Sequence, residues 1–175
     1  MKDLVLSPLG LRVGNKLFPC VIGKNGISKL KREGDGKTPT GKHQIVGMLY
    51  RPDKISQPRK WALPIRPRDI WSDDVKDPNY NLMGKLPSLF DHEQLFRCDN
   101  LYDLVIITNW NWPYAVKGRG SAIFIHSWKK SASHTEGCIA LSKKNLFKVA
   151  KFIDFGSQLI VPDTLHAHQR WPNRL

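Results

Sequence analysis

The stretch that decides the fold is "AIFIHSWKKSASHTEGCIALS", residues 122–142. It contains an apolar run that ends at His126, a polar segment, and a second apolar run that begins at Cys138. Short apolar runs bounded by turn residues are typical of buried strands. The stretch therefore predicts two strands joined by a polar loop, with a histidine ending the first and a cysteine starting the second.

These two side chains can do chemistry together. A thiol needs a base or a positive neighbour to ionise near neutral pH, and a histidine beside it provides both. If the loop brings them together, Cys138 is a candidate nucleophile and His126 its base. Gly137 would leave room for a substrate beside the sulfur, and backbone N–H groups at Gly137 and Cys138 would bind a developing oxyanion. The alternative is a buried, unreactive cysteine and a histidine that merely ends a strand.

The rest of the chain predicts a mainly β fold with one helix. Its other apolar runs are short and separated by Gly and Pro: "DLVLSP", "LRVG", "LFPCVIG", "HQIVGMLY", "LYDLVIIT" and "QLIVP". We expect an amphipathic helix after Cys138, capped by Ser142 and ended by Gly156. Its apolar face would be Leu146, Val149, Ala150 and Ile153.

Residues 51–100 differ from this pattern. They are polar, aromatic and rich in proline, as in "RPDKISQPRKWALPIRPRDIWSDDVKDPNYN", and we interpret them as an irregular excursion. Its aromatic residues argue against disorder, and ordered loops of this length are usually functional. Trp71, Tyr80 and Asn81 are therefore candidate substrate contacts. The equally weighted alternative is that these three residues only hold the excursion against the body of the protein.

Composition limits the class of protein. The 175 residues suit one domain, 1–175, with a C-terminal tail at 163–175 that contains His166 and His168. No apolar run approaches the roughly 18 residues of a membrane span, and the N-terminus shows no signal-peptide core. The 28 Lys and Arg against 15 Asp and Glu give a charge of +13. That charge favours polyanionic partners, but the basic residues are scattered, which fits an ordinary basic surface better than a specific nucleic-acid site.

The three cysteines, Cys20, Cys98 and Cys138, cannot form a complete disulfide framework. They show no C-x-x-C or other paired-ligand spacing, so we expect no zinc site and no other metal or cofactor. We expect Cys20 and Cys98 to be structural or incidental rather than catalytic. We also expect the protein to be a monomer.

At this point the segment "FIHSWKKSASHTEGCIALS" resembles the active-site segment of YkuD-type L,D-transpeptidases, in the branch of stand-alone catalytic domains. In that family a strand-end histidine precedes a Ser/Thr-x-Gly-Cys segment whose cysteine is the acyl-enzyme nucleophile. The matching residues here are His126 and Thr135-Glu136-Gly137-Cys138. The resemblance extends over residues 10 to 162, through "EGDGKTPTGKHQI", "WSDDVKDPNYN", "LYDLVIITNWN" and "GRGSAIFIH".

The resemblance implies a YkuD-like β-sandwich and a site built on Cys138, His126 and Gly137, with Ser127 and Thr135 near the substrate. A backbone carbonyl near Ser127 would orient the histidine, with Asp73, Asp74 and Asp77 as weaker candidates for that role or as turn caps. The sequence departs from the common motif, which has histidine directly before Gly-Cys and arginine or asparagine two positions after the cysteine. Those positions here are Glu136 and Ala140. Glu136 would lie at the rim, favour a cationic group such as the amine of an acceptor, and raise the pKa of His126. The alternative is that Glu136 is a solvated loop residue.

The implied reaction is formation of peptidoglycan cross-links through a thioester on a tetrapeptide stem. Such a cysteine would also form an adduct with a carbapenem. A hydrolytic L,D-carboxypeptidase would use the same acyl-enzyme. A non-catalytic basic domain that binds envelope polymer is the alternative outside enzymes, and it would leave the Cys138 thiol unreactive. The resemblance implies the cell envelope or periplasm, although no signal peptide is visible and the cytoplasm stays open.

Overall fold

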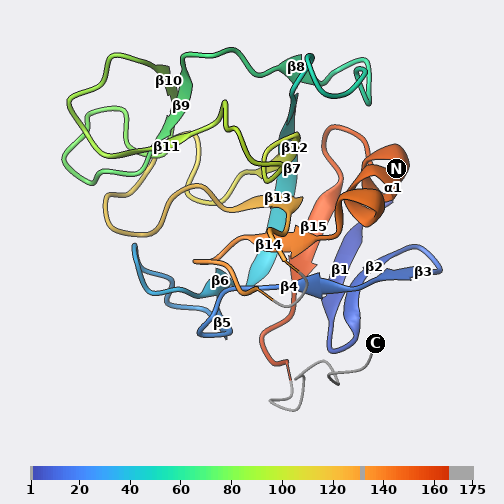
Figure 1. The fold of residues 1–175 in the computed structure, drawn as a ribbon. Coiled ribbons are helices and arrows are strands. Elements are labelled where there is room, and N and C mark those ends of the chain that lie inside the picture. The colour runs from blue at the N-terminus through green and yellow to red at the C-terminus, as the bar shows by residue number, and fades with distance from the viewer. Residues whose placement is uncertain (1, 131–132, 166–175) are drawn as a thin grey trace.

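The structure is a computed structural model that describes residues 2–130 and 133–165. Figure 1 shows its strands and its helix. In chain order they are β1 (Leu4–Ser7), β2 (Gly10–Val13), β3 (Lys16–Phe18), β4 (Cys20–Val21), β5 (Ile27–Ser28), β6 (Thr38–Pro39), β7 (Gly41–Tyr50), β8 (Leu63–Pro64), β9 (Asp69–Ser72), β10 (Met83–Lys85), β11 (His92–Gln94), β12 (Leu104–Thr108), β13 (Phe124–Ser127), β14 (Ile139–Leu141), α1 (Lys143–Phe152) and β15 (Gln158–Val161).

One large sheet organises the molecule, in the order β3-β2-β1-β15-β7-β12-β13-β14-β4, with β8 beside β7. The two outermost strands of this order, β3 and β4, are separated in the chain only by Pro19. The sheet must therefore curl until its two ends approach each other, which produces an almost closed, barrel-like body. The predicted mainly β fold with one helix is confirmed.

Strand β12 is buried on both faces, which explains its unbroken apolar sequence. Leu104 and Ile106 belong to the main core, which lies between the sheet and α1. Val105 and Ile107 point the other way and belong to a second core under the excursion. Successive side chains alternate between the faces of a strand, so a strand with a core on each side is apolar at consecutive positions, and in β12 only the last residue, Thr108, is polar.

Helix α1 follows the predicted pattern at its start. Ser142 is its N-cap, and the Ser142 hydroxyl accepts a hydrogen bond from the Asn145 N–H at 3.2 Å. Leu146, Val149 and Ala150 are fully buried against the sheet. The helix ends earlier than predicted, because its last residue is Phe152 and Gly156 lies in the turn beyond it.

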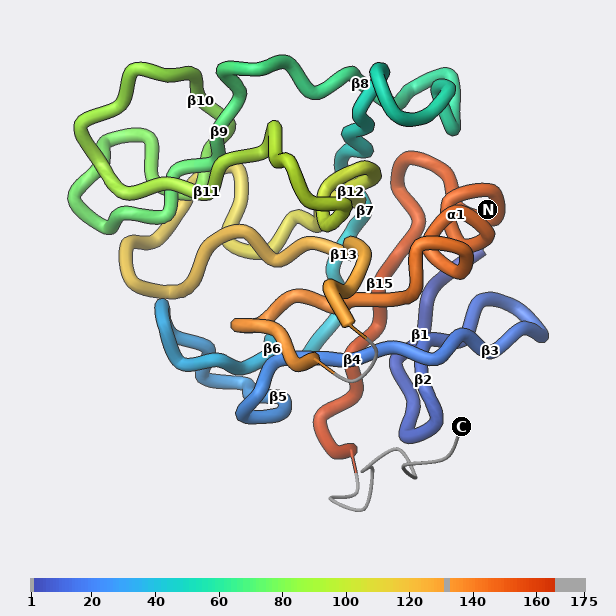
Figure 2. The backbone as a smooth tube through the Cα atoms, viewed as in Figure 1, coloured from blue at the N-terminus to red at the C-terminus, as the bar shows by residue number. Residues whose placement is uncertain are grey.

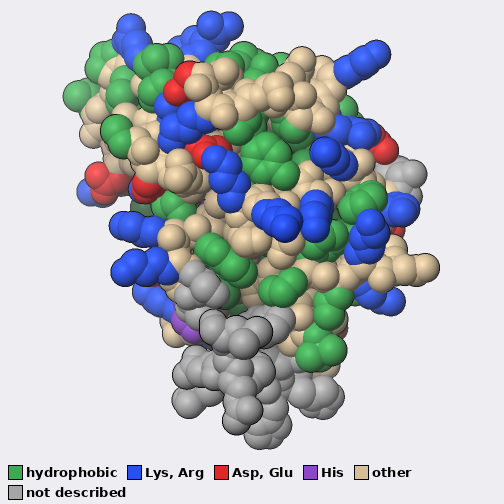
Figure 3. All heavy atoms as spheres, turned by 45° about the vertical axis from the view of Figure 1, so that its right-hand side comes forward, with side chains coloured by type: hydrophobic (Ala, Val, Ile, Leu, Met, Phe, Trp, Pro, Cys, Tyr) green, Lys and Arg blue, Asp and Glu red, His purple; other side chains and the backbone are tan. Residues whose placement is uncertain are grey.

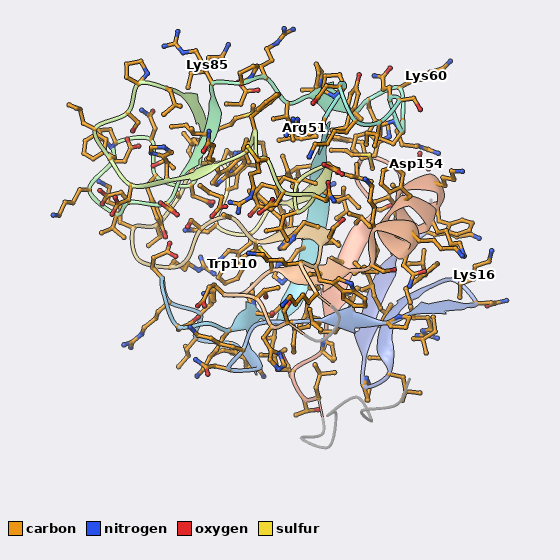
Figure 4. All side chains as sticks on the ribbon, viewed as in Figure 1. Lys16, Arg51, Lys60, Lys85, Trp110 and Asp154 are labelled. Carbon is orange, nitrogen blue, oxygen red and sulfur yellow. The ribbon has the colours of Figure 1, made fainter. Side chains whose placement is uncertain are left out.

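The excursion, residues 51–100, forms a separate layer over one side of the sheet, as the green segment of Figures 1 and 2 shows. It is less irregular than predicted, because it contains the antiparallel sheet β10-β9-β11. Strands of three or four residues are too short to leave a recognisable period in a sequence. Arg51, labelled in Figure 4 at the end of β7, anchors the layer. Its guanidinium donates to the Arg97 carbonyl and stacks on the Phe96 ring at 3.5 Å.

Within the described residues, no helix has the length and apolar character needed to cross a membrane. On the face that Figure 3 shows, Lys and Arg side chains are spread over both layers and do not form one block. Residues 166–175 of the predicted tail, with His166 and His168, lie outside the described residues.

Candidate active site

His126 and Cys138 lie on the side of the sheet that the excursion covers. Strands β13 and β14 are parallel neighbours, and His126 pairs with Ala140. Cys138 precedes Ala140 by two residues, so its side chain leaves the chain on the same face as that of Ala140. The thiol packs against the second core, and both His126 and Cys138 line one cavity of about 390 Å³.

The imidazole of His126 is fixed in one orientation. Its Nδ1 lies 2.7 Å from the Ser127 carbonyl oxygen, and because a carbonyl only accepts, the ring proton is on Nδ1. Nε2 is then the basic nitrogen. Tyr102 packs edge-on against the ring with centroids 5.3 Å apart, and His126 is only 8% exposed. The predicted carbonyl contact near Ser127 is confirmed. The Ser127 hydroxyl is buried and does not line the cavity.

The thiol of Cys138 makes two hydrogen bonds with the backbone of the neighbouring segment. Sγ donates to the Ala122 carbonyl at 3.0 Å and accepts from the Phe124 N–H at 3.4 Å. No hydrogen bond joins it to His126 within the described part of the chain. Burial raises the pKa of the Cys138 thiol to about 12 and lowers the pKa of His126 to about 4. Near neutral pH the two groups are therefore an uncharged thiol and an uncharged imidazole.

The turn before Cys138 is held by Thr135. Its hydroxyl donates to the Cys138 carbonyl at 2.6 Å and accepts from the Gly137 N–H at 3.2 Å. Gly137 has a φ of +148°, and a Cβ there would lie 2.8 Å from the Lys37 carbonyl oxygen. The close approach of residues 36–38 therefore requires glycine at this position. The predicted space for a substrate beside the sulfur is on the other side of the turn, in the cavity that Gly137 also lines.

Thr38 supports this turn from the opposite side, and sequence reasoning did not single it out. Its hydroxyl donates to the Gly137 carbonyl at 2.8 Å and accepts from the Gly23 N–H at 3.0 Å. Thr38 is completely buried. It lies in the "TPTG" segment that carried part of the family resemblance, which was the available signal.

The excursion and the loop before β6 add charged residues to the cavity. Glu33, Asp73 and Glu93 line it, together with Lys31. Burial, and then the charges of Glu93 and Glu33, raise the pKa of Asp73 to about 6. The neighbouring candidates Asp74 and Asp77 instead accept hydrogen bonds from the backbone N–H groups of Lys76 and Asn79, as turn caps do.

The three residues expected to contact substrate from the excursion are all buried outside the cavity lining. Asn81 accepts hydrogen bonds from the Trp71 indole N–H and the Ala122 N–H, at 3.0 and 2.9 Å. The Tyr80 hydroxyl donates to Glu33 and accepts from the Gly120 N–H. Trp71 packs edge-on against Phe124 at 4.9 Å. Their contacts join the excursion to the strand that carries His126 and to the cavity wall.

Glu136 and His134 lie at the rim of the cavity and are exposed. The Glu136 carboxylate forms an ion pair with Lys24 at 2.7 Å. The expectation that Glu136 raises the pKa of His126 is wrong, because burial dominates and lowers that pKa. Cys20 is buried in the main core and Cys98 is exposed, and neither lines the cavity.

The site thus combines a thiol and an oriented imidazole in one cavity on a β scaffold. The comparison with protein families then identifies the family. The family model "YkuD: L,D-transpeptidase catalytic domain" matches residues 11–161, and the chain belongs to this family. No curated protein matches at a significant level.

Several solved structures are similar to this chain. The Bd1075 protein of Bdellovibrio bacteriovorus matches at 18% identity and a TM-score of 0.50, covering 94% of this chain and 49% of its own. An L,D-transpeptidase from Mycobacterium smegmatis matches at 16% identity and a TM-score of 0.44, covering 92% of this chain and 58% of its own. The helical cell shape determining protein Pgp2 from Campylobacter jejuni matches at 16% identity and a TM-score of 0.48, covering 94% of this chain and 48% of its own. This chain spans only about half of each, and such low identities concern the fold alone.

Proposed function

We propose that the protein is a cysteine-dependent L,D-transpeptidase that forms peptidoglycan cross-links through a thioester on tetrapeptide stems. Cys138 is the nucleophile and His126 the base. The observation that supports this most is that the thiol and an imidazole with its proton on Nδ1 line the same cavity. The cell envelope is the proposed location, because peptidoglycan lies outside the cytoplasmic membrane.

The reaction has two halves. In the first, Nε2 of His126 takes the Sγ proton while Sγ attacks the carbonyl carbon that joins the diamino acid to the terminal D-alanine. The C–N bond breaks, the imidazolium returns the proton to the leaving amine, and D-alanine departs. In the second half, the amine of another stem attacks the thioester carbon, loses a proton to His126, and releases the thiol. The product is a cross-link, and the cysteine and histidine are regenerated.

The other residues of the site position Cys138 and His126. The carbonyl of Ser127 orients His126, and Thr135 and Gly137 hold the turn that presents Cys138. The Gly137 N–H, which the sequence suggested as an oxyanion donor, instead donates to the Thr135 hydroxyl at 3.2 Å. Trp71, Tyr80 and Asn81 support the cavity wall from behind, since their polar atoms bond within the protein. Substrate contacts then come from the residues that line the cavity.

Burial keeps the resting pair uncharged, so ionisation must accompany binding. A neutral thiol and a neutral imidazole are the stable form when the pKa of the first is about 12 and that of the second about 4. Bringing a substrate carbonyl to Sγ replaces the bonds of the thiol to the backbone and allows Sγ to turn toward Nε2. We therefore expect proton transfer and attack to be concerted.

The test is intact-mass spectrometry after incubation with a carbapenem, followed by incubation with tetrapeptide stems. The wild-type protein should gain one carbapenem mass at Cys138, and Cys138→Ala should gain none. Replacing Cys20 or Cys98 by Ser should leave the adduct unchanged, because neither lines the cavity. An adduct on Cys138→Ala would overturn the assignment.

Two alternatives have distinct results in the same experiment. Release of D-alanine from stems without cross-linked dimers would identify an L,D-carboxypeptidase, in which water resolves the thioester. Absence of both the adduct and stem processing, with retained binding to anionic envelope polymer, would identify a non-catalytic basic domain. The charge of +13 is the observation that keeps this second alternative in view.

A further inference from the structure

Lys31 reaches the cavity through a passage that two glycines keep open. A Cβ on Gly120 would lie 3.1 Å from both Cγ and Cε of Lys31, and one on Gly137 would lie 3.5 Å from Cε. These glycines come from separate segments, and both have positive φ, at +98° and +148°. The aliphatic part of the Lys31 side chain therefore runs between the segment before β13 and the turn that precedes Cys138.

The ammonium group of Lys31 is held by two hydrogen bonds, which leaves one of its three donors unused among the described residues. Nζ donates to Asp35 Oδ1 at 2.6 Å and to the Arg32 carbonyl at 2.8 Å, and the side chain is 2% exposed. Asp35 is itself fixed, because its carboxylate also accepts from the N–H groups of Arg32 and Lys37. An ammonium has three N–H donors, and within the described residues the third has no partner.

Lys31 is the buried cation among the described residues of the cavity lining. Of the other basic groups there, Lys129 and His134 are exposed at the rim, and His126 is buried and uncharged near neutral pH. Solvent ions screen exposed charges and screen buried ones far less. Lys31, although paired with Asp35, is therefore the buried positive charge that an anionic group would meet in this cavity, whose lining also holds the carboxylates of Glu33, Asp73 and Glu93.

We propose that Lys31 binds the terminal carboxylate of the donor stem, and so positions the scissile bond for Cys138; this rests on the proposed function. In the stem, only the amide nitrogen and one Cα separate that carboxylate from the carbonyl carbon that is attacked. Its partner must therefore lie beside the nucleophile. The aliphatic part of the Lys31 side chain is packed against Gly137, the residue before Cys138, which meets this requirement. Lys31 thus selects stems that end in a free carboxylate.

The test compares a tetrapeptide stem with its C-terminal amide, using mass spectrometry to follow loss of the terminal residue. The wild-type protein should prefer the acid over the amide by about 10- to 100-fold in kcat/KM, as expected for a hydrogen bond between charged groups. The preference should persist between low and high salt, because Lys31 is buried. Lys31→Met should remove most of this preference, by lowering kcat/KM for the acid and leaving kcat/KM for the amide unchanged. Lys31→Arg should retain part of it.

Lys29→Met is the matched control, because Lys29 lies on the same loop, loses the same charge, and pairs with Asp163 at the surface. It should keep the wild-type acid-to-amide ratio. An equal ratio for Lys31→Met and wild type would overturn the inference, as would a wild-type enzyme with no preference for the acid. If Lys31→Met does not fold, a wild-type enzyme without preference for the acid still overturns the inference, and the reduced ratio expected of Lys31→Arg still supports it.

A second readout separates this inference from the proposed function. Iodoacetate and iodoacetamide are thiol-alkylating reagents that differ only in carrying a carboxylate or a carboxamide, and the rate of each is measured at Cys138. In the wild-type protein the ratio of their rates should exceed that of Lys31→Met by about tenfold, because a nearby cation attracts the anionic reagent. If no stem is processed but this ratio changes, the proposed function fails and the carboxylate site stands. If stems are processed and neither ratio changes, only the carboxylate site fails.

Discussion

Thr38 offers the sharpest test of how the body of the protein holds the turn that carries Cys138. Its buried hydroxyl makes two hydrogen bonds, one to the Gly137 carbonyl at 2.8 Å and one from the Gly23 N–H at 3.0 Å. Thr38→Val keeps the shape of the side chain and removes both. Each buried backbone group left without a partner costs about 1–3 kcal/mol. For the two groups together, we therefore expect the free energy of unfolding to fall by about 2–6 kcal/mol.

That loss is a large share of the roughly 5–15 kcal/mol that stabilises a domain, and at this chain length it corresponds to a fall in Tm of roughly 4–24 °C. The assay is urea denaturation followed by tryptophan fluorescence, with carbapenem acylation of Cys138 measured in parallel. Acylation should slow by about tenfold, because the displaced turn carries the nucleophile. Thr38→Ser keeps the hydroxyl and should lose less than half as much stability. A Thr38→Val protein within about 0.5 kcal/mol of wild type would refute the reasoning.

Four further outcomes follow from the site. Gly137→Ala should destabilise the protein by about 2–4 kcal/mol in urea denaturation, because its Cβ would meet the Lys37 carbonyl; Gly118→Ala, with positive φ but open space, should cost only about 1 kcal/mol. Carbapenem acylation should remain constant down to about pH 5 and fall near the His126 pKa of about 4, since the base must be neutral; a fall centred near pH 6.5 would contradict this. The same lowered pKa means that the unfolded chain binds a proton first, so stability should drop by up to about 3 kcal/mol as pH falls from 6.5 to 4, and His126→Gln should lack this component. Glu136→Gln should change acylation and cross-linking by less than about twofold, because that carboxylate is exposed and already paired with Lys24; loss of cross-linking alone would instead restore Glu136 as an acceptor site.

Local patterns predicted the parts of the fold that depend on neighbours in the chain. The Ser142 cap and the apolar face of Leu146, Val149 and Ala150 lie within one short segment, and both were found. The end of the helix was misplaced at Gly156, because burial of Ile153 in the main core favours an extended backbone there. The apolar runs around Leu104–Ile107 and Phe124–His126 became strands, since few other structures bury such runs on both faces.

The sequence by itself determined that this chain has a cysteine and a histidine at adjoining strand ends, and the motif that places it in its family. Only the tertiary structure decided what surrounds them. Thr38 and Gly137 are 99 residues apart in the chain, and the Tyr80 hydroxyl contacts Glu33 across 47. No local period records such contacts, because they arise when the curled sheet and the excursion bring distant loops to one cavity. The same closure buries Lys31 beside the turn and removes Trp71, Tyr80 and Asn81 from the cavity lining, since burial depends on which segments pack together and not on the residue type alone.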